Sequence, residues 1–308
     1  MILVTGGTGF VGRNIVRKLI QEGQQVRCLA RRASTSHILE DMPTPNRNAP
    51  GPVEFCDGDV TKPSSLEGAM RGIEVVIHLV GIIREIPPSV TFERVHAEGT
   101  YNVVTAGVRA GVKKFVHMSA MGTRPDAPSR YHTTKWLGEL AVKSSGLPYV
   151  IFRPSIICGK DDEFVNMFAK LIRQTWPLPF LAVIGSGETR MQPVYVGDVA
   201  QCFVKAVLDS SIVNRTYELG GPETLAIDEI LDTIMKVMGA RRIKLHIPVT
   251  LAWPMAYLME KTSPKPMLTR EQLVMLQIDN TGDVTPMKKD FGLEPMRFEE
   301  AIRTYLKP

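Results

Sequence analysis

The sequence predicts an α/β protein in which a doubly wound parallel sheet is joined to a smaller mixed α/β lobe. Two observations support this prediction: strand-like runs alternate with helical patterns, and the runs are apolar throughout. Six such runs occur in the first half of the chain, at residues 1–5, 24–30, 52–56, 73–80, 112–119 and 147–153. Continuous apolar runs are typical of strands buried on both faces of a parallel sheet, whose crossovers are the intervening helices.

Between these runs, apolar residues recur at helical spacing. One stripe extends from Phe10 to Leu19 and another from Val103 to Val112. Gly23 follows the first stripe at a position where a helix ends, immediately before the next strand. The first half of the chain is therefore predicted to consist of repeated strand–helix units.

After Arg153 the pattern becomes looser. Helices are expected near residues 162–175, 197–209, 226–239, 249–261 and 297–306. Short strands are expected near residues 181–184, 191–195, 215–219 and 242–246. We expect a core over residues 1–155 and a smaller lobe over residues 156–308, with some segments of the lobe returning to the core.

Composition and charge narrow the class of protein. The 308 residues are 44% hydrophobic and 22% charged, which excludes collagen, a disordered acidic tail and a coiled coil. No two cysteines form a CxxC pair, so their spacing predicts neither a disulfide scaffold nor a metal site. The net charge of +5 and the pI of about 9.0 favour anionic ligands without being a nucleic-acid signature.

No segment of the sequence resembles a targeting signal or a transmembrane helix. The most apolar late stretch, residues 247–259, is interrupted by Pro248 and Pro254 and is shorter than the ~20 residues that span a bilayer. We expect a cytoplasmic protein, and a location on a membrane surface stays open.

A glycine-rich turn follows the first strand and opens the first helix. Gly6 permits a tight turn, Gly9 lets the backbone approach a pyrophosphate, and Gly12 lets the helix pack closely on the strand. The first helical residues, Phe10 and Val11, are expected to contribute amide groups that hold the anion with the helix dipole. Because strand, turn and helix occur in the order of a Rossmann site, the core is expected to bind a dinucleotide.

The end of the second strand predicts NADP(H) in preference to NAD(H). An acidic residue about 20 positions beyond the glycine turn usually binds a free ribose 2′-hydroxyl. Here Ala30 is followed by Arg31 and Arg32, and no carboxylate is present. A guanidinium can bind a 2′-phosphate through two bonds and stack on adenine. The alternative is that both arginines are solvated loop residues.

Four further segments carry motifs at strand ends and on a predicted helix. The first motif is Tyr131-xxx-Lys135, and Ser119 lies twelve residues upstream of its tyrosine. The other three motifs are Gly58-Asp59-Val60, His78-Leu79-Val80-Gly81 and Arg153-Pro154-Ser155. With the glycine turn, these motifs resemble the extended or atypical branch of the short-chain dehydrogenase/reductase superfamily over nearly the whole chain. The resemblance implies cofactor contacts at Asp59, Val60, Leu79, Val80, Gly81, Lys135, Pro154 and Ser155.

The resemblance also implies a catalytic role for Ser119, Tyr131 and Lys135. Residues four apart project from one face of a helix, so Tyr131 and Lys135 are expected to lie together. A nearby ammonium favours the phenolate, and a protonated tyrosine can donate to a carbonyl. Ser119 would bind the substrate oxygen and Lys135 would hold the nicotinamide ribose. The chemistry would be hydride transfer at a carbonyl or carbinol carbon.

Residues 96–102, 119–122 and 191–200 resemble one atypical group in particular, which contains the nucleotide-binding accessory subunit of respiratory complex I and its bacterial relatives. Three functions stay open: an NADP(H)-dependent oxidoreductase, a non-catalytic NADP(H)-binding subunit or assembly factor, and a nucleotide-sugar epimerase or dehydratase. Many extended members have Asn in place of His96, and sugar-modifying members often have Tyr near Cys158, so both residues argue against the third function.

The remaining candidates have ordinary interpretations. His78 and His117 are interpreted as satisfied core histidines, and His132 as a surface residue that faces away from Tyr131. Residues 247–276 carry an apolar excess. This excess fits a core or lid, a lipophilic or quinone-like substrate, or an interface with a protein partner or a membrane surface.

Overall fold

The computed structural model describes residues 1–31, 53–175, 177–263 and 266–307. The chain divides into two compact units, each with its own hydrophobic core. The first unit comprises residues 1–126, 131–153 and 199–217, and the second comprises residues 127–130, 154–198 and 218–308. The late segment 199–217 thus belongs to the first unit.

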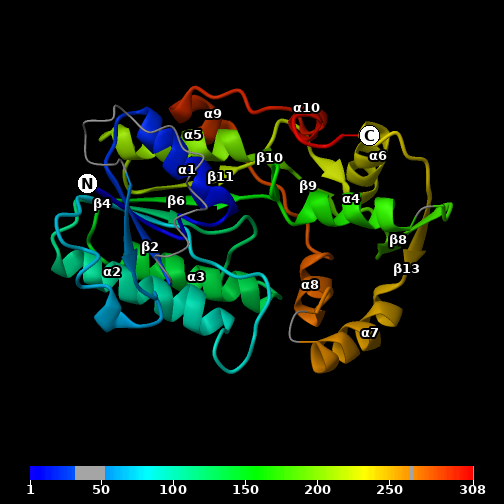
Figure 1. Ribbon diagram of the computed structural model, residues 1–308, viewed down its shortest axis with the longest axis horizontal. Helices are drawn as coiled ribbons and strands as arrows, with labels where there is room; N and C mark the ends of the chain where they lie inside the picture. Colours follow the sequence, from blue (N-terminus) through cyan, green and yellow to red (C-terminus); the bar gives the residue numbers. More distant parts are fainter. Residues whose placement is uncertain (32–52, 176, 264–265, 308) are drawn as a thin grey trace. The chain divides into compact units, whose positions relative to one another are not determined.

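A seven-stranded sheet forms the centre of the first unit (Figure 1). Its strands are β1 (Ile2–Thr5), β2 (Val26–Ala30), β3 (Val53–Asp57), β4 (Val75–His78), β5 (Lys114–Met118), β6 (Tyr149–Pro154) and β11 (Arg215–Leu219). The spatial order is β11-β6-β5-β4-β1-β2-β3, and the pairings from β3 to β6 are parallel. Because the chain order reverses between β1 and β4, this is a doubly wound sheet, and the predicted fold class is confirmed.

Helices cover both faces of this sheet. The helices α1 (Phe10–Gln21) and α5 (Val196–Leu208) lie on one face, and α2 (Gly99–Arg109) and α3 (Arg130–Lys143) lie on the other (Figure 1). A short 3₁₀ turn, η2 (Pro63–Ser65), follows β3, and a wider π-helical turn, η3 (Glu93–Glu98), leads into α2. Buried aliphatic side chains such as Leu3, Val76, Val103 and Val142 fill the space between the sheet and the α2–α3 layer.

The second unit combines short strand pairs with helices. Its strands are β7 (Ile157–Cys158), β8 (Phe180–Ile184), β9 (Arg190–Met191), β10 (Val194–Tyr195), β12 (Leu225–Ala226) and β13 (Ile243–Ile247), which pair as β10-β7, β12-β9 and β13-β8. Its helices are α4 (Phe164–Gln174), α6 (Ile227–Val237), α7 (Val249–Thr262), α8 (Arg270–Met275), α9 (Thr285–Phe291) and α10 (Phe298–Arg303). The core of this unit lies among α4, α6 and α10, around Val165, Ile230 and Phe298.

The structure differs from the expected elements in the second half of the chain. The strand expected near residues 191–195 is two strands, β9 and β10, separated by Gln192 and Pro193, because proline lacks the N–H that a continuous ladder needs. The short helices α8 and α9 were not expected, since six or seven residues give too little periodicity to detect. Within the described residues, no helix combines the length and the apolarity needed to cross a membrane.

Candidate functional site

The glycine-rich turn after β1 is shaped by the absence of side chains. Gly6 has a φ of 77°, and a Cβ there would lie 3.3 Å from backbone atoms of Leu79 and Val80. A Cβ on Gly12 would overlap the Gly6 carbonyl oxygen, so α1 packs against the turn only because Gly12 has no side chain. The turn therefore brings the residues after β1 and after β4 into contact.

The start of α1 suits an anionic ligand. Gly9 is the exposed N-cap residue, no side chain caps the helix, and no carboxylate lies in its first turn. The helix begins with Phe10 and Val11, whose amides belong to the first turn. Such amides have no intrahelical acceptor and lie at the positive end of the helix dipole. The residues of the turn therefore fit the pyrophosphate of a dinucleotide.

Arg31 follows β2 and Asp59 follows β3, and the charge of Arg31 acts on the Asp59 carboxylate. Arg31 is exposed, whereas Arg32 lies outside the described residues. The half-buried Asp59 carboxylate accepts hydrogen bonds from the N–H and the hydroxyl of Thr61 at 2.9 and 2.8 Å. Burial opposes its ionisation, but these bonds and the charge of Arg31 hold the pKa of Asp59 below its usual value. Val60 is buried.

Tyr131 and Lys135 lie one turn apart on α3. The Lys135 Nζ donates to the Met118 carbonyl at 3.0 Å and lies 2.9 Å from the position that a Cβ of Gly81 would occupy. Burial lowers the pKa of Lys135 to about 8, although the charge of Glu139 acts in the opposite direction. Burial raises the pKa of Tyr131 to about 12. At neutral pH the phenol therefore keeps its proton, and the amine is mostly charged.

His96 supports this pair from the η3 turn, a role that the sequence analysis did not assign. The Ile82 N–H donates to its Nε2 at 3.0 Å, so Nδ1 carries the proton and donates to the Thr134 hydroxyl at 3.1 Å. The His96 and Tyr131 rings meet edge to face, with their centroids 5.3 Å apart. Burial and the charge of Lys135 lower the pKa of His96 to about 2, so the imidazole is neutral.

Glu139 and Arg153 form a buried ion pair between α3 and β6, which the sequence analysis missed. The Arg153 Nε and terminal nitrogen donate to the two carboxylate oxygens at 2.7 and 2.8 Å, and Lys143 donates at 3.0 Å. Burial raises the pKa of Glu139, but these partners and a hydrogen bond from Ser119 outweigh it and lower the pKa. The Ser119 hydroxyl oxygen also lies 3.3 Å from the Thr123 hydroxyl oxygen. Ser119 therefore has partners within the protein.

Two stacked histidines lie beside these residues, on β4 and β5. The His78 ring nitrogens contact the hydroxyls of Thr5 at 2.6 Å and Thr100 at 3.1 Å, as expected for a satisfied core histidine. The His117 ring lies 5.4 Å from that of His78, but neither of its nitrogens has a hydrogen-bond partner among the described residues. Both are core residues, and the expectation of a satisfied histidine is wrong for His117.

The prediction that His132 lies at the surface is wrong, because its side chain is buried. The loop after β5 covers it: a Cβ on Gly122 would lie 3.5 Å from its Nε2. The ring also meets Tyr131 edge to face at 5.0 Å. Helical spacing alone predicted the opposite face, but this loop widens the buried face of α3.

Pro154 and Ser155 follow Arg153 as part of the second unit. The Ser155 hydroxyl donates to the Asn280 side chain and accepts from the Gln192 N–H at 3.2 Å. The structure thus brings together the residues after β1, β4 and on α3, and it gives Ser155 structural partners within the second unit.

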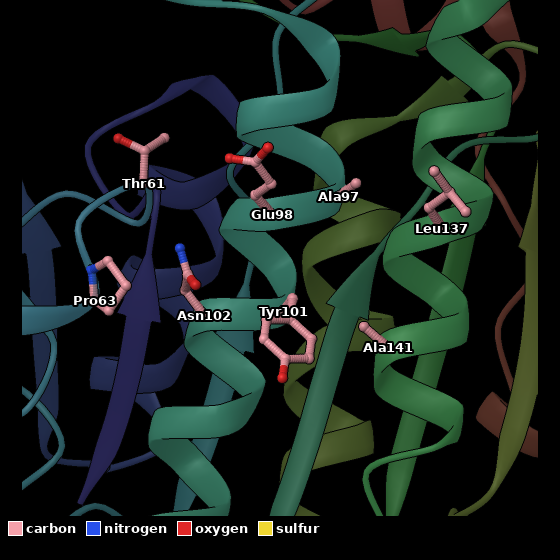
Figure 2. A pocket seen from close by; sticks show the side chains of 8 residues that line it. All are labelled: Thr61, Pro63, Ala97, Glu98, Tyr101, Asn102, Leu137 and Ala141. Atoms are coloured by element: carbon pink, nitrogen blue, oxygen red, sulfur yellow. The ribbon is translucent and has the colours of Figure 1, made fainter.

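A surface hollow of about 530 Å³ lies between α2, α3 and the loop after β3 (Figure 2). Tyr101, Leu137 and Ala141 line it, with Glu98 and Asn102 beside them. None of the predicted site residues lines this hollow. Among the described residues, no group of three or more His, Cys, Asp or Glu side chains could hold a metal ion.

The chain is similar to known proteins over almost its whole length. The chain resembles the 40 kDa subunit of mitochondrial NADH-ubiquinone oxidoreductase from Neurospora crassa (26% identity, 99% of this chain and 78% of the relative). It also resembles 3 beta-hydroxysteroid dehydrogenase/Delta 5-->4-isomerase from Mycobacterium tuberculosis (28% identity, 96% of this chain and 86% of the relative).

Among solved structures, the triphenylmethane reductase of Citrobacter sp. complexed with NADP(H) has the same fold, with a TM-score of 0.76 at 17% identity over 99% of this chain and 100% of the other. The family model described as "NAD dependent epimerase/dehydratase family" matches residues 2–220. The chain therefore belongs to the NAD dependent epimerase/dehydratase family, within the extended short-chain dehydrogenases/reductases.

Proposed function

We propose that the protein is an NADP(H)-dependent oxidoreductase that transfers hydride to or from the carbonyl or carbinol carbon of a lipophilic small molecule. The observation that supports this most is the position of the Lys135 amine. It lies beside Tyr131 on α3 and against Gly81, in the segment whose Leu79 and Val80 contact Gly6 of the phosphate-binding turn. In this proposal residues 1–155 bind the cofactor and residues 156–308 bind the substrate.

The ionisation of Tyr131 suits the reductive direction. A reduced nicotinamide, when bound, supplies the hydride. Tyr131 gives its hydroxyl proton to the substrate oxygen as the carbonyl carbon gains the hydride, so that a carbinol forms. Lys135 stabilises the resulting phenolate, which regains a proton from water. A phenol with a pKa of about 12 is fully protonated before this step. Because burial also makes it a weaker acid than free tyrosine, the transfer depends on the stabilisation of the phenolate by Lys135.

His96 and Thr134 act as positioning residues. The neutral His96 ring packs against Tyr131, and the Thr134 hydroxyl donates to the Tyr131 carbonyl at 3.0 Å. Since His96 also accepts from the Ile82 N–H, it connects the loop after β4 to α3. This connection limits the movement of the phenol relative to the loop that lines the cofactor.

The choice of NADP(H) rests on Arg31. It is exposed directly after β2, where a 2′-phosphate would need a cation, and its charge is balanced in part by Asp59. A guanidinium can bind a phosphate through two hydrogen bonds. The lipophilic substrate is supported by the relative from M. tuberculosis, whose name is that of a hydroxysteroid dehydrogenase.

The test is NADPH oxidation against a panel of ketones, quinones and hydroxysteroid-derived ketones. Tyr131→Phe should lower the turnover rate by about 10²–10⁴-fold, because it removes the proton donor. Its affinity for NADPH should stay within about threefold of the wild type, since the phenyl ring still packs against His96. Equal turnover by the wild type and Tyr131→Phe would contradict the assignment.

For the cofactor, Arg31→Ala should weaken NADPH binding by about 10- to 100-fold and leave NADH binding unchanged, because a charged hydrogen-bonded pair is worth about 1.5–3 kcal/mol. Arg109→Ala, which removes an exposed arginine from the end of α2, is the matched control. Equal loss of NADPH and NADH affinity in Arg31→Ala would favour a solvated arginine.

A second candidate is a non-catalytic NADP(H)-binding subunit or assembly factor. It is favoured by the partners of Ser119, whose hydroxyl is bound to Thr123 and Glu139 within the protein. The resemblance to the complex I subunit from N. crassa agrees with it. Tight NADPH binding with no oxidation of NADPH by any substrate in the panel would support this candidate. The cofactor would then act by stabilising the folded state.

A further inference from the structure

The helix α7 buries a narrow face made of small residues. Ala252 and Ala256 are fully buried, and they form a small cluster with Leu273 of α8, packed against Val249 and Leu268. Alanine side chains allow close helix packing but bury little area. This contact therefore occupies one side of α7 and leaves the rest of its surface uncovered within the second unit.

The uncovered side of α7 is apolar. Its exposed side chains are those of Leu251, Trp253, Met255, Tyr257 and Leu258, each between 41% and 66% exposed. From Val249 to Met259 the sequence contains no charged residue. An exposed helix face usually carries charges, so a contiguous apolar face of this kind indicates a docking surface.

The sequence that contains α7 is rich in cations. Residues 241–270 contain six lysines and arginines and one glutamate. One of these cations, Lys244, pairs with Asp228 and Asp232 at 3.3 and 2.8 Å. The Glu260 carboxylate is neutralised by Arg270, whose N–H and Nε donate to its oxygens at 2.7 and 2.8 Å. Lys261 and Arg270 lie over the Tyr257 ring, 5.7 and 5.0 Å from its centroid. Cations therefore border the apolar face at the end of α7.

We propose that the outer face of α7 docks on a lipid bilayer that carries anionic headgroups. An apolar helix face bordered by lysine and arginine, with Trp and Tyr at the boundary, is the pattern of helices that lie in the membrane interface. Lys261 and Arg270 would contact headgroup phosphates, while Leu251 and Leu258 would enter the acyl boundary. This docking is independent of hydride transfer and would give the protein access to substrates dissolved in a membrane.

Two further exposed apolar side chains lie on α3. Leu137 and Leu140 on α3 are 49% and 43% exposed, and Leu137 lines the hollow in Figure 2. That hollow is lined by Glu98 and Asn102, whose acidic and amide groups do not favour anionic headgroups. The α3 leucines therefore provide a control for exposed hydrophobicity beside an acidic side chain.

The experiment is cosedimentation of the full chain with phosphatidylcholine vesicles, with and without phosphatidylglycerol. We expect the wild type to bind the anionic vesicles, with an affinity that falls as salt is raised. The double variant Leu251→Gln/Leu258→Gln should bind at least about tenfold more weakly, because it removes the two most exposed leucines of α7. The control Leu137→Gln/Leu140→Gln should bind like the wild type.

Three results would overturn the proposal. The first is no binding of the wild type to anionic vesicles, and the second is equal binding by the α7 and α3 double variants. The third is a dimer in light scattering that Leu251→Gln/Leu258→Gln dissociates while vesicle binding is absent, because α7 would then contact a second copy. Circular dichroism shows whether each variant is folded, and the proposal is tested only with variants that retain the wild-type spectrum.

Discussion

The helices α3 and α7 have the same length, 14 residues, and both depart from the usual amphipathic pattern, in opposite directions. The buried face of α3 is polar and includes His132, Lys135 and Glu139. The exposed face of α7 is apolar, with Leu251 and Leu258 as its most exposed large apolar residues. An ordinary amphipathic helix would expose polar residues such as those of α3 and bury apolar residues such as those of α7.

The difference between α3 and α7 indicates two roles: α3 holds a site inside the chain, and α7 presents a surface to a ligand outside it. Burying polar side chains is costly unless each has a partner, so the polar face of α3 is held by residues from the sheet and from η3. Exposing apolar side chains requires no partner within the chain, and it indicates a ligand outside it. Substitutions of the buried polar residues of α3 should therefore strongly affect stability or cofactor binding, whereas substitutions on the outer face of α7 should leave both unchanged.

The largest effect is expected at Glu139. Glu139→Ala should lower the free energy of unfolding by about 3–5 kcal/mol, because Arg153 and Lys143 would lose their carboxylate partner in a buried position. Urea denaturation gives this value. Because the pKa of Glu139 is lowered in the folded state, its contribution is complete above the pKa of an unfolded glutamate, about 4.3, and is lost as the pH falls further.

The double variant Glu139→Met/Arg153→Met is the control for this prediction. Replacing both members of a buried pair by apolar residues is often nearly neutral, so the double variant should be more stable than Glu139→Ala. If the double variant is as unstable as the sum of its single variants, the two side chains contribute independently and the pair is not a unit.

The next effect concerns the charge of Lys135. Because burial lowers its pKa to about 8, the amine loses its proton above that pH, and NADPH affinity should fall about tenfold for each further pH unit. Isothermal titration calorimetry at a series of pH values measures this. Lys135→Met should bind NADPH weakly at every pH and show no step near pH 8. A step of the same size in the variant would assign it to another group.

How far the sequence predicts this site depends on whether each part is formed by neighbouring residues or by residues far away along the chain. The glycine turn could be predicted, because the positive φ of Gly6 and the close backbone contact of Gly12 leave no place for a side chain. The spacing of Tyr131 and Lys135 predicted a shared helix face. Glu139 lies on that face too, but an isolated glutamate on a helix is normally solvated. Its burial depends on a distant strand.

The interior histidines show a similar limit. The sequence indicated that they lie in strand-end apolar runs, which is correct for His78 and His117. It could not indicate which of the two has hydroxyl partners, because Thr100 reaches His78 from α2. His132 was assigned to the surface from helical geometry alone, and the loop that covers it cannot be placed by periodicity.

The two stacked histidines, His78 and His117, allow a test with a smaller expected effect. His78→Phe should cost about 1–3 kcal/mol, because the buried hydroxyls of Thr5 and Thr100 would each lose a partner. His117→Phe should change the free energy of unfolding by less than about 1 kcal/mol, because no hydrogen bond to the described residues is lost. Thermal denaturation of both variants provides the comparison. Equal losses would show that His117 has a polar partner in solution.

The smallest effect is expected on α7, where it is most informative. Leu258→Gln should change the free energy of unfolding by less than about 0.5 kcal/mol, because a side chain that is 62% exposed makes few contacts within the chain. Ala256→Gln, two residues earlier on the buried face, should cost about 1–3 kcal/mol by overpacking. Urea denaturation measures both. A leucine within a core costs far more to replace, so a large loss in Leu258→Gln would mean that α7 packs against its own chain in solution. A negligible loss, together with weaker vesicle binding, would assign its outer face to a surface outside the molecule.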